Sequence, residues 1–412
     1  MHLPWDVLLS PVAGPVTSYS LPPDLYRKAR SLAHVRLGFE IGGFVYVLGA
    51  LWLTLRWKVA PRIQDWSARL SRKSIFQGLF FAPILIAWLA LLELPPQIAS
   101  HWTACIYGIS IQGWRSWAGD WSKALGLEIV LGSVVIWGFY FLLRRSPRRW
   151  WMYAWLASLP LILVAVFAEP LLIEPMFHRF APLQEKDPSL VAQIECVADR
   201  AGVNIPPARI FWMRASDKTP GMNAYVAGIG TSKRVVVWDT TIGQETTPEI
   251  VAVFGHELGH YVLGHVWKGM AGFSALLLLF LYAESYLVPW LVARRGGDWG
   301  IGRIGGWASL PAFLLVLVML MFAADPIANG FSRWMEHRAD VYGLEVTHGI
   351  LADAGQAAAK SFQREGEISL ADPAPNPLDV FWFYDHPPIP GRVRFCASYN
   401  PWRSGRRPEF VK

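Results

Sequence analysis

The sequence predicts a mainly α-helical, polytopic membrane protein with a small α+β domain outside the membrane. The composition is apolar, with 53% hydrophobic and only 17% charged residues, which is unusual for a soluble enzyme. Six apolar runs are long enough to cross a bilayer. Between the fourth and the fifth run, helix and strand patterns alternate, which predicts a folded domain in that interval.

Each predicted span is a nearly uninterrupted stretch of apolar residues. The six spans are 37–55, 75–94, 124–143, 150–173, 270–293 and 305–324. The first 30 residues lack a continuous apolar core, and Pro22 and Pro23 interrupt them. We therefore expect no cleavable secretory signal, and membrane insertion depends on the spans themselves.

Acidic residues inside several spans indicate a polar interior. Glu40, Glu128, Glu169 and Glu284 would be costly if they faced lipid, so they are expected to face protein or water. The alternative is that some lie near helix ends and reach the headgroups. Between the second and third spans, residues 95–123 contain four tryptophans and few charges, which predicts an interfacial segment.

The positive charge follows the predicted spans rather than a nucleic-acid surface. The net charge is +7, and the basic residues gather in the short loops 56–73, 144–149 and 294–303. The positive-inside rule places these loops in the cytoplasm and the α+β domain on the opposite side. We expect no nucleic-acid partner. The three cysteines are scattered and form neither a disulfide framework nor a metal motif.

The stretch His256-Glu257-Leu258-Gly259-His260 predicts a zinc site on a helix. Positions four apart lie on one helical face, so both imidazoles can reach one ion while Glu257 stands beside them. The start of the helix is marked by Thr247 as a cap and Pro248 at the first helical position.

The third protein ligand is predicted about 80 residues later. The histidine-rich extension of the motif fails, because Leu263 and Val266 occupy the positions that it requires. His265 is expected on the opposite helical face. Glu336 and Asp340 are four apart on another predicted helix, where Glu336 can bind the metal and Asp340 can orient His256. A solvated acidic face is the alternative.

These residues predict metal-assisted peptide hydrolysis with one Zn2+ per chain. Glu257 is the expected general base. The zinc helix leads into the fifth span and Glu336 follows the sixth, so the site lies close to the bilayer. Two other classes stay open, namely a transporter or channel with a structural metal site and a catalytically silent scaffold.

The sequence divides into five segments. They are an N-terminal segment 1–34, four spans in 35–174, a protease domain 175–268, two spans in 269–330, and a third-ligand helix with a C-terminal segment in 331–412. Within the domain we expect a helix at 188–201 and strands at 208–213, 223–228 and 234–239. The strand that begins with Asn223, Ala224 and Tyr225 could bind a substrate backbone at a sheet edge, or it could form a purely structural hairpin.

In combination, these motifs resemble the type I CAAX prenyl proteases, which are integral-membrane gluzincin zinc endopeptidases, and more distantly the HtpX-type quality-control proteases. The similarity runs over about residues 105–395. It is carried by the stretch from Glu174 to Leu183 after the fourth span, Asn223-Ala224-Tyr225, Asp239-Thr240-Thr241, the zinc helix, Glu336 to Asp340, and Asp385-His386-Pro387-Pro388 followed by Arg392.

The resemblance implies a helical bundle around a polar chamber, with the zinc facing inward and the peptide laid against Asn223, Ala224 and Tyr225. It implies that His386 stabilises the oxyanion and that Arg392 holds the substrate or the site architecture. The expected substrate is a peptide, and the sequence leaves three alternatives open, namely a prenylated C-terminal motif, a peptide pheromone and damaged membrane proteins. The resemblance also implies a cytosol-facing site and usually seven spans, whereas this sequence predicts six.

Overall fold

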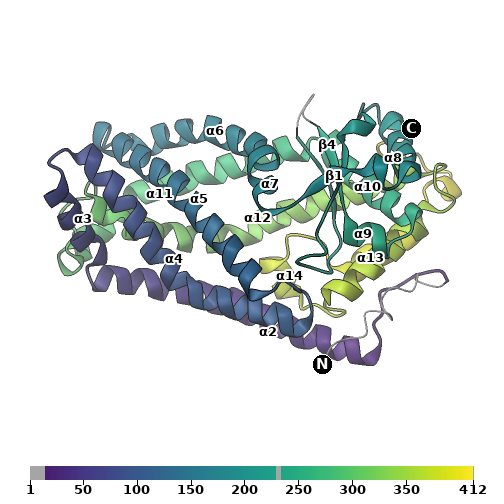
Figure 1. Cartoon of the computed structure of the whole chain (residues 1–412), viewed down its shortest axis with the longest axis horizontal. Helices are drawn as coiled ribbons and strands as arrows, with labels where there is room; N and C mark the ends of the chain where they lie inside the picture. The colour runs from purple at the N-terminus through teal and green to yellow at the C-terminus, as the bar shows by residue number, and fades with distance from the viewer. Residues whose placement is uncertain (1–13, 229–232, 412) are drawn as a thin grey trace.

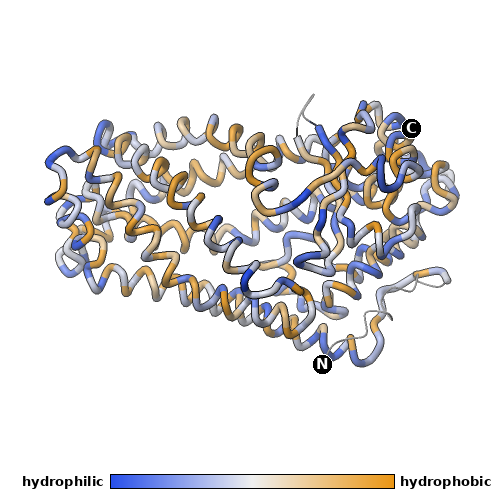
Figure 2. The backbone as a smooth tube through the Cα atoms, in the orientation of Figure 1, coloured by the Kyte–Doolittle hydropathy of each residue, from blue (hydrophilic) through white to orange (hydrophobic). Residues whose placement is uncertain are grey.

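The computed structural model describes residues 14–228 and 233–411. Figure 1 shows a bundle of long helices that carries a compact domain with the sheet at one end. Among these described residues, six helical segments are long and apolar enough to span a membrane, which confirms the predicted number. Apolar residues predominate along these helices (Figure 2). The long helices are α2 (Pro23–Arg56), α4 (Ser74–Tyr107), α5 (Trp114–Arg145), α6 (Trp150–Ala168), α11 (His265–Trp299) and α12 (Leu310–Thr347).

The basic loops meet at the end of the bundle that lies away from the sheet. The short helix α3 (Val59–Leu70) lies there (Figure 1). Arg144 donates a 2.8 Å hydrogen bond to the carbonyl of Gly305 and another to Ser74, so the end of α5, the start of α4 and the loop before α12 are held together. The guanidinium of Arg144 also lies 4.2 Å from the ring centroid of Trp307.

The acidic residues of the spans differ in their surroundings. Glu284 is buried, whereas Glu40, Glu128 and Glu169 are exposed at the protein surface of the structure. Glu40 and Glu169 line cavities of about 390 Å³ each. Glu284 therefore faces protein, and Glu40 and Glu169 face cavities, as predicted for acidic residues within spans.

The small domain contains a four-stranded mixed sheet with the order β1-β2-β4-β3. Strands β1 (Phe180–Pro182) and β2 (Ile210–Met213) are antiparallel, β2 and β4 (Arg234–Trp238) are parallel, and β3 (Ala224–Ala227) is antiparallel to β4. The three predicted strands and the helix α8 (Pro188–Arg200) are confirmed. Strand β1 was not predicted, because it has only three residues and includes a proline.

Helix α10 (Thr247–Val262) crosses the domain beside this sheet and carries the H-E-x-x-H motif. Its cap is Thr246 rather than Thr247, because Thr246 and Glu249 form a reciprocal capping box. Ile250, Val251 and Phe254 belong to the same buried cluster as Val235 of β4, which anchors the helix to the sheet. The predicted start was therefore wrong by one residue.

The segment 95–123 is not a separate element. Residues 95–107 continue α4, α5 begins at Trp114, and only a short loop lies between them. That loop packs on the small domain, where the amide of Ile111 donates to the carbonyl of Lys218 at 3.0 Å. Its position relative to lipid stays a prediction.

The C-terminal segment adds three helices that close over α10 and α12. They are α13 (Ala354–Ser369), α14 (Pro377–Phe383) and α15 (Ile389–Ser398). The predicted boundary between 269–330 and 331–412 falls inside α12, so the sixth span and the third-ligand helix form one continuous rod.

Candidate active site

His256, His260 and Glu336 form a compact group of possible metal ligands. One donor atom from each residue lies within 4.8 Å of the others. The two Nε2 atoms are 3.1 Å apart, and each lies 3.3 Å from an oxygen of Glu336. A tetrahedral ion with bonds of about 2.1 Å would separate its ligands by roughly 3.4 Å, so the spacing fits zinc.

Glycines bring the two ligand helices together. A Cβ atom on Gly259 would lie 3.2 Å from the Cα of Ala339, and one on Gly343 would lie 2.7 Å from the amide nitrogen of His256. Because neither glycine has a side chain, α10 and α12 approach backbone to backbone. This contact places Glu336 opposite the two histidines.

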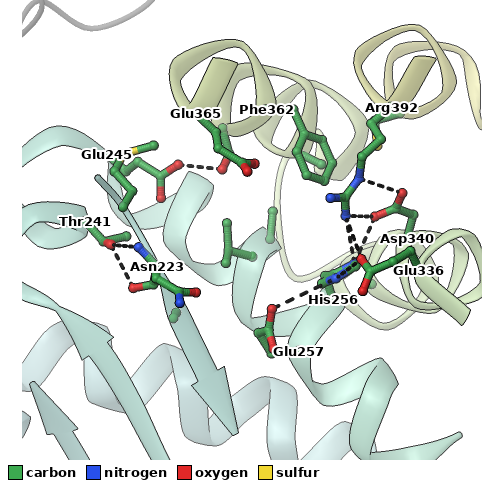
Figure 3. Close-up of a pocket in the computed structure, with 18 of the residues that line it drawn as sticks. Asn223, Thr241, Glu245, His256, Glu257, Glu336, Asp340, Phe362, Glu365 and Arg392 are labelled. Atoms are coloured by element: carbon green, nitrogen blue, oxygen red, sulfur yellow. Dashed lines mark hydrogen bonds and ion pairs between the residues drawn. The ribbon is translucent and has the colours of Figure 1, made fainter. Parts of the chain in front are cut away.

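Asp340 and Arg392 form a second layer behind the ligands. Asp340 Oδ1 lies 2.8 Å from His256 Nδ1, which leaves Nε2 of that ring directed toward the metal position. Arg392 donates to both carboxylate oxygens of Asp340, at 2.6 Å and 3.0 Å. Figure 3 shows this chain of contacts from Arg392 through Asp340 to His256.

The electrostatics of the two histidines suit a bound cation. Burial and the neighbouring His256 lower the pKa of His260 to about 3, so its ring is neutral at pH 7 and can offer a lone pair. Burial alone would lower the pKa of His256, yet hydrogen bonds with Asp340 and Glu336 raise it to about 10. The carboxylates of Asp340 and Glu336 thus favour a positive charge at the position of His256.

His265 lies beside the site, contrary to the sequence-based expectation. Its Nδ1 is 3.0 Å from Nδ1 of His260. The regular helix on which the prediction relied ends at Val262, and Gly264 adopts a positive φ of 67° before α11 begins at His265. The turn brings His265 back toward His260, where it contacts the ring nitrogen that faces away from the metal position.

Glu257 and His386 both line the cavity beside the ligands. Glu257 Oε1 lies 3.9 Å from His256 Nε2, close enough to share a water molecule with the metal position. His386 Nε2 lies 3.3 Å from Glu336, and its Nδ1 lies 2.9 Å from Asp385. The hydrogen bond with Asp385 raises the pKa of His386 above its ordinary value.

Strand β3 forms one wall of this cavity, whose volume is about 400 Å³. Asn223, Ala224 and Tyr225 all line it. Thr241 fixes the backbone just before the strand. Its hydroxyl accepts a 2.9 Å hydrogen bond from the amide of Asn223 and donates a 2.8 Å hydrogen bond to the carbonyl of the same residue. Figure 3 shows Asn223 and Thr241 across the cavity from His256.

The structure thus brings together every residue that the sequence analysis assigned to the site. It also adds Glu245 and His265, which the sequence analysis did not assign. Glu245 follows the motif Asp239-Thr240-Thr241 closely, and this proximity was the only available signal. His265 is five residues after His260, and a regular helix would direct it away from the site, whereas the break at Gly264 brings it back.

Two family models match the chain over most of its length. The model of peptidase family M48 matches residues 184–399, and the model described as CAAX prenyl protease N-terminal, five membrane helices, matches residues 14–179. Within 14–179 the described residues contain four candidate spans, so this chain departs from the five helices of that description.

Individual proteins with similar sequences agree with the family models. An uncharacterized metalloprotease of Bacillus subtilis, YhfN, is 31% identical over 91% of this chain and 88% of its own length. CAAX prenyl protease 1 of Saccharomyces cerevisiae is 28% identical over 66% of this chain and 62% of its own length. The crystal structure of S. mikatae Ste24p has the same fold, with a TM-score of 0.75 at 24% identity, covering 90% of this chain and 88% of that one.

The metal-ligand geometry, the six spans and both family models agree with one another. The chain therefore belongs to peptidase family M48 and is an integral-membrane zinc metalloprotease of the CAAX prenyl protease type.

Proposed function

We propose that this protease cleaves extended peptides that pair with the free edge of β3 and that carry a prenyl group near the scissile bond. The observation that supports the peptide mode is the position of β3. It is the last strand of the sheet order, and it lines the same cavity as the zinc ligands. A substrate strand added to this edge would pass directly over His256 and Glu257.

The hydrogen-bonding pattern of β3 supports this mode. The carbonyl of Asn223 accepts from the amide of Trp238, so Asn223 is directed toward β4. Because backbone groups alternate along an antiparallel strand, those of Ala224 are directed away from β4 and into the cavity. They are available to a substrate backbone.

We assign the following roles to the residues around the metal. His256, His260 and Glu336 would hold a zinc ion, which when bound would polarise the scissile carbonyl and lower the pKa of water. Glu257 accepts a proton from the attacking water and passes it to the leaving amine. His386 donates from Nε2 to the developing oxyanion, and its contact with Asp385 holds the ring in place.

Asp340 and Arg392 have positioning roles in this proposal. Asp340 orients His256, and Arg392 neutralises the buried Asp340. The guanidinium of Arg392 is buried and directed to Asp340, which supports site architecture rather than direct substrate binding, the other role that the resemblance implied.

The membrane geometry and the family support a lipid-modified substrate. The zinc helix α10 is followed by the spanning helix α11 after two residues, and Glu336 lies on the spanning helix α12. A peptide held at the bilayer by a prenyl group would reach such a site more readily than a free peptide, because anchoring raises its local concentration.

The test compares three peptides with the purified enzyme in proteoliposomes. They are a farnesylated C-a-a-X peptide, its unmodified form and an unrelated extended peptide. The proposal predicts the highest kcat/KM for the farnesylated peptide and loss of all cleavage after zinc removal by a chelator. Equal cleavage of all three would overturn prenyl selectivity and favour a broad quality-control protease, and no cleavage of any peptide would overturn the proposed reaction.

A further inference from the structure

The cavity next to the zinc ligands has an acidic wall, formed by Glu245 and Glu365, that the reaction itself does not use. Glu245 lies just after α9 (Asp239–Gln244), and Glu365 lies on α13. Both residues line the cavity. In Figure 3 Glu245 lies near Thr241 and Asn223, and Glu365 lies between Glu245 and Phe362.

Glu245 is buried with one unsatisfied carboxylate oxygen. Its relative exposure is 9%. Its Oε1 accepts a 2.5 Å hydrogen bond from the hydroxyl of Ser361, while its Oε2 has no hydrogen-bond partner among the described residues. A buried oxygen without a partner is costly, so a ligand that donates to it would gain free energy.

The charges around Glu245 favour a cationic ligand. Glu249 and Glu365 are the acidic groups that face it, and Arg364 is the basic one. Arg364 lies 3.3 Å from Glu367, and Glu249 is engaged in the capping box of α10. Glu365 has neither a hydrogen bond nor an ion pair with another residue in 14–228 or 233–411 in this structure. Arg392 also acts on Glu365, but its guanidinium is bound to Asp340. A cation beside Glu245 and Glu365 would therefore meet two carboxyl groups, and its attraction is strongest once Glu245 is ionised, because burial raises the pKa of Glu245 to about 8.

The rest of the cavity suits a long side chain with an apolar stem. Val253, Leu344 and Phe362 also line it. Lysine and arginine have such stems, which pack along apolar surface while the charged tip reaches a polar group. A short side chain would not reach the carboxyl groups of the acidic wall, and an acidic side chain would be repelled by them.

We propose that Glu245 and Glu365 form a subsite for one lysine or arginine side chain of the substrate, a specificity that rests on the proposed binding of the peptide along β3. Such a subsite would select one peptide register over others, because the backbone pairing with β3 is the same for any sequence.

The proposal is tested with peptides that differ at one position. Starting from any peptide that the enzyme cleaves, lysine or its uncharged isostere norleucine is placed at each position on both sides of the scissile bond. We expect one position at which lysine raises kcat/KM at least tenfold over norleucine. In Glu245→Gln this ratio should fall toward one, and Glu365→Gln should lower it in the same direction.

The matched control is Glu185→Gln, which removes the same charge from an exposed glutamate outside the cavity. This variant should retain the lysine preference of the wild type. A ratio near one at every position in the wild type would overturn the subsite. So would a lysine preference that persists undiminished in both Glu245→Gln and Glu365→Gln.

A binding measurement separates the subsite from the proposed reaction. The affinity of zinc-loaded Glu257→Gln for the lysine and norleucine peptides is measured by fluorescence anisotropy. If this variant binds the lysine peptide more tightly, and adding Glu245→Gln abolishes the difference, the subsite is supported. That holds even if the wild type hydrolyses neither peptide, because absence of hydrolysis would overturn only the proposed reaction. Equal binding of the two peptides overturns the subsite and leaves hydrolysis untouched.

The pH dependence provides a further readout. Burial raises the pKa of Glu245 to about 8, with Glu249 and Glu365 adding to the shift and Ser361 and Arg364 opposing it. The lysine-to-norleucine ratio should therefore rise between about pH 6 and pH 9 as the carboxylate ionises. Enzyme groups whose titration affects the cleavage of both peptides equally do not change this ratio. A flat ratio in the wild type contradicts the assignment of Glu245.

Discussion

Gly343 of α12 lies against the backbone of His256, so that a Cβ atom added there would come within 2.7 Å of the His256 amide nitrogen and 2.9 Å of its Cα. The approach of these two residues sets the distance between α10 and α12. The position of Glu336 relative to the two histidines therefore depends on the absence of a single methyl group.

We predict that Gly343→Ala separates the two helices and weakens zinc binding. Overpacking of this kind typically costs about 1–3 kcal/mol, and here the neighbour is backbone, which cannot rotate away. The measurement is the zinc content and thermal stability of the purified variant. Gly269→Ala is the control, because a Cβ atom there meets nothing within 4 Å. A Gly343→Ala variant with normal zinc content would contradict this explanation.

Much of this arrangement could be predicted from the sequence because local patterns determine it. The spacing of His256 and His260 requires only one helical turn, and the six spans follow from runs of apolar residues. The contact of α10 with α12 was predicted only indirectly, through Glu336 as the third metal ligand. Which helix packs against which face depends on tertiary structure, and no local sequence pattern specifies it.

The errors have the same origin in each case. His265 was placed on the wrong side because one glycine, Gly264, adopts a positive φ and redirects the chain. Glu245 was missed because its role depends on Ser361, more than a hundred residues away in the sequence.

Glu257→Gln is predicted to retain zinc and to lose peptide hydrolysis. The amide has the same shape as the carboxylate but cannot accept the proton of the attacking water. Zinc content by elemental analysis and turnover of the best peptide are measured on the same sample. Turnover at the wild-type rate would remove Glu257 from the mechanism.

Asp340→Asn is predicted to lower zinc affinity or activity by about 10- to 100-fold. The substitution keeps the shape but removes the charge that holds His256 Nδ1 and balances Arg392. Competition with a chromogenic chelator gives the zinc affinity. Asp298→Asn, at a side chain that is 67% exposed, is the matched control. Identical zinc affinities for the two variants would exclude the positioning role.

The stability of the protein is predicted to fall as pH rises toward 8, in part through Glu245. Burial raises the folded-state pKa of this carboxyl from an ordinary value of 4.5 to about 8. Its contribution is therefore fully present below about pH 4.5 and is lost as pH rises through about 8. Melting temperatures of wild type and Glu245→Gln between pH 5 and pH 8.5 test this. The difference between them should change with pH, whereas Glu185→Gln should follow the wild type.

His265 is predicted to support zinc binding through His260. The two Nδ1 atoms are 3.0 Å apart, so one ring must donate and the other accept. Only a His260 ring with its proton on Nδ1 leaves Nε2 free for the metal, which requires His265 to accept at Nδ1. His265→Ala removes this acceptor and should weaken zinc binding by about tenfold or more. His265→Gln should restore part of the affinity, because the carbonyl oxygen of its side chain can accept the same hydrogen bond.

His337→Gln is the control, since His337 is next to Glu336 in the sequence but its ring packs on Phe395 instead, with centroids 4.7 Å apart. Equal zinc affinity in His265→Ala and the wild type would show that His260 is oriented without this contact.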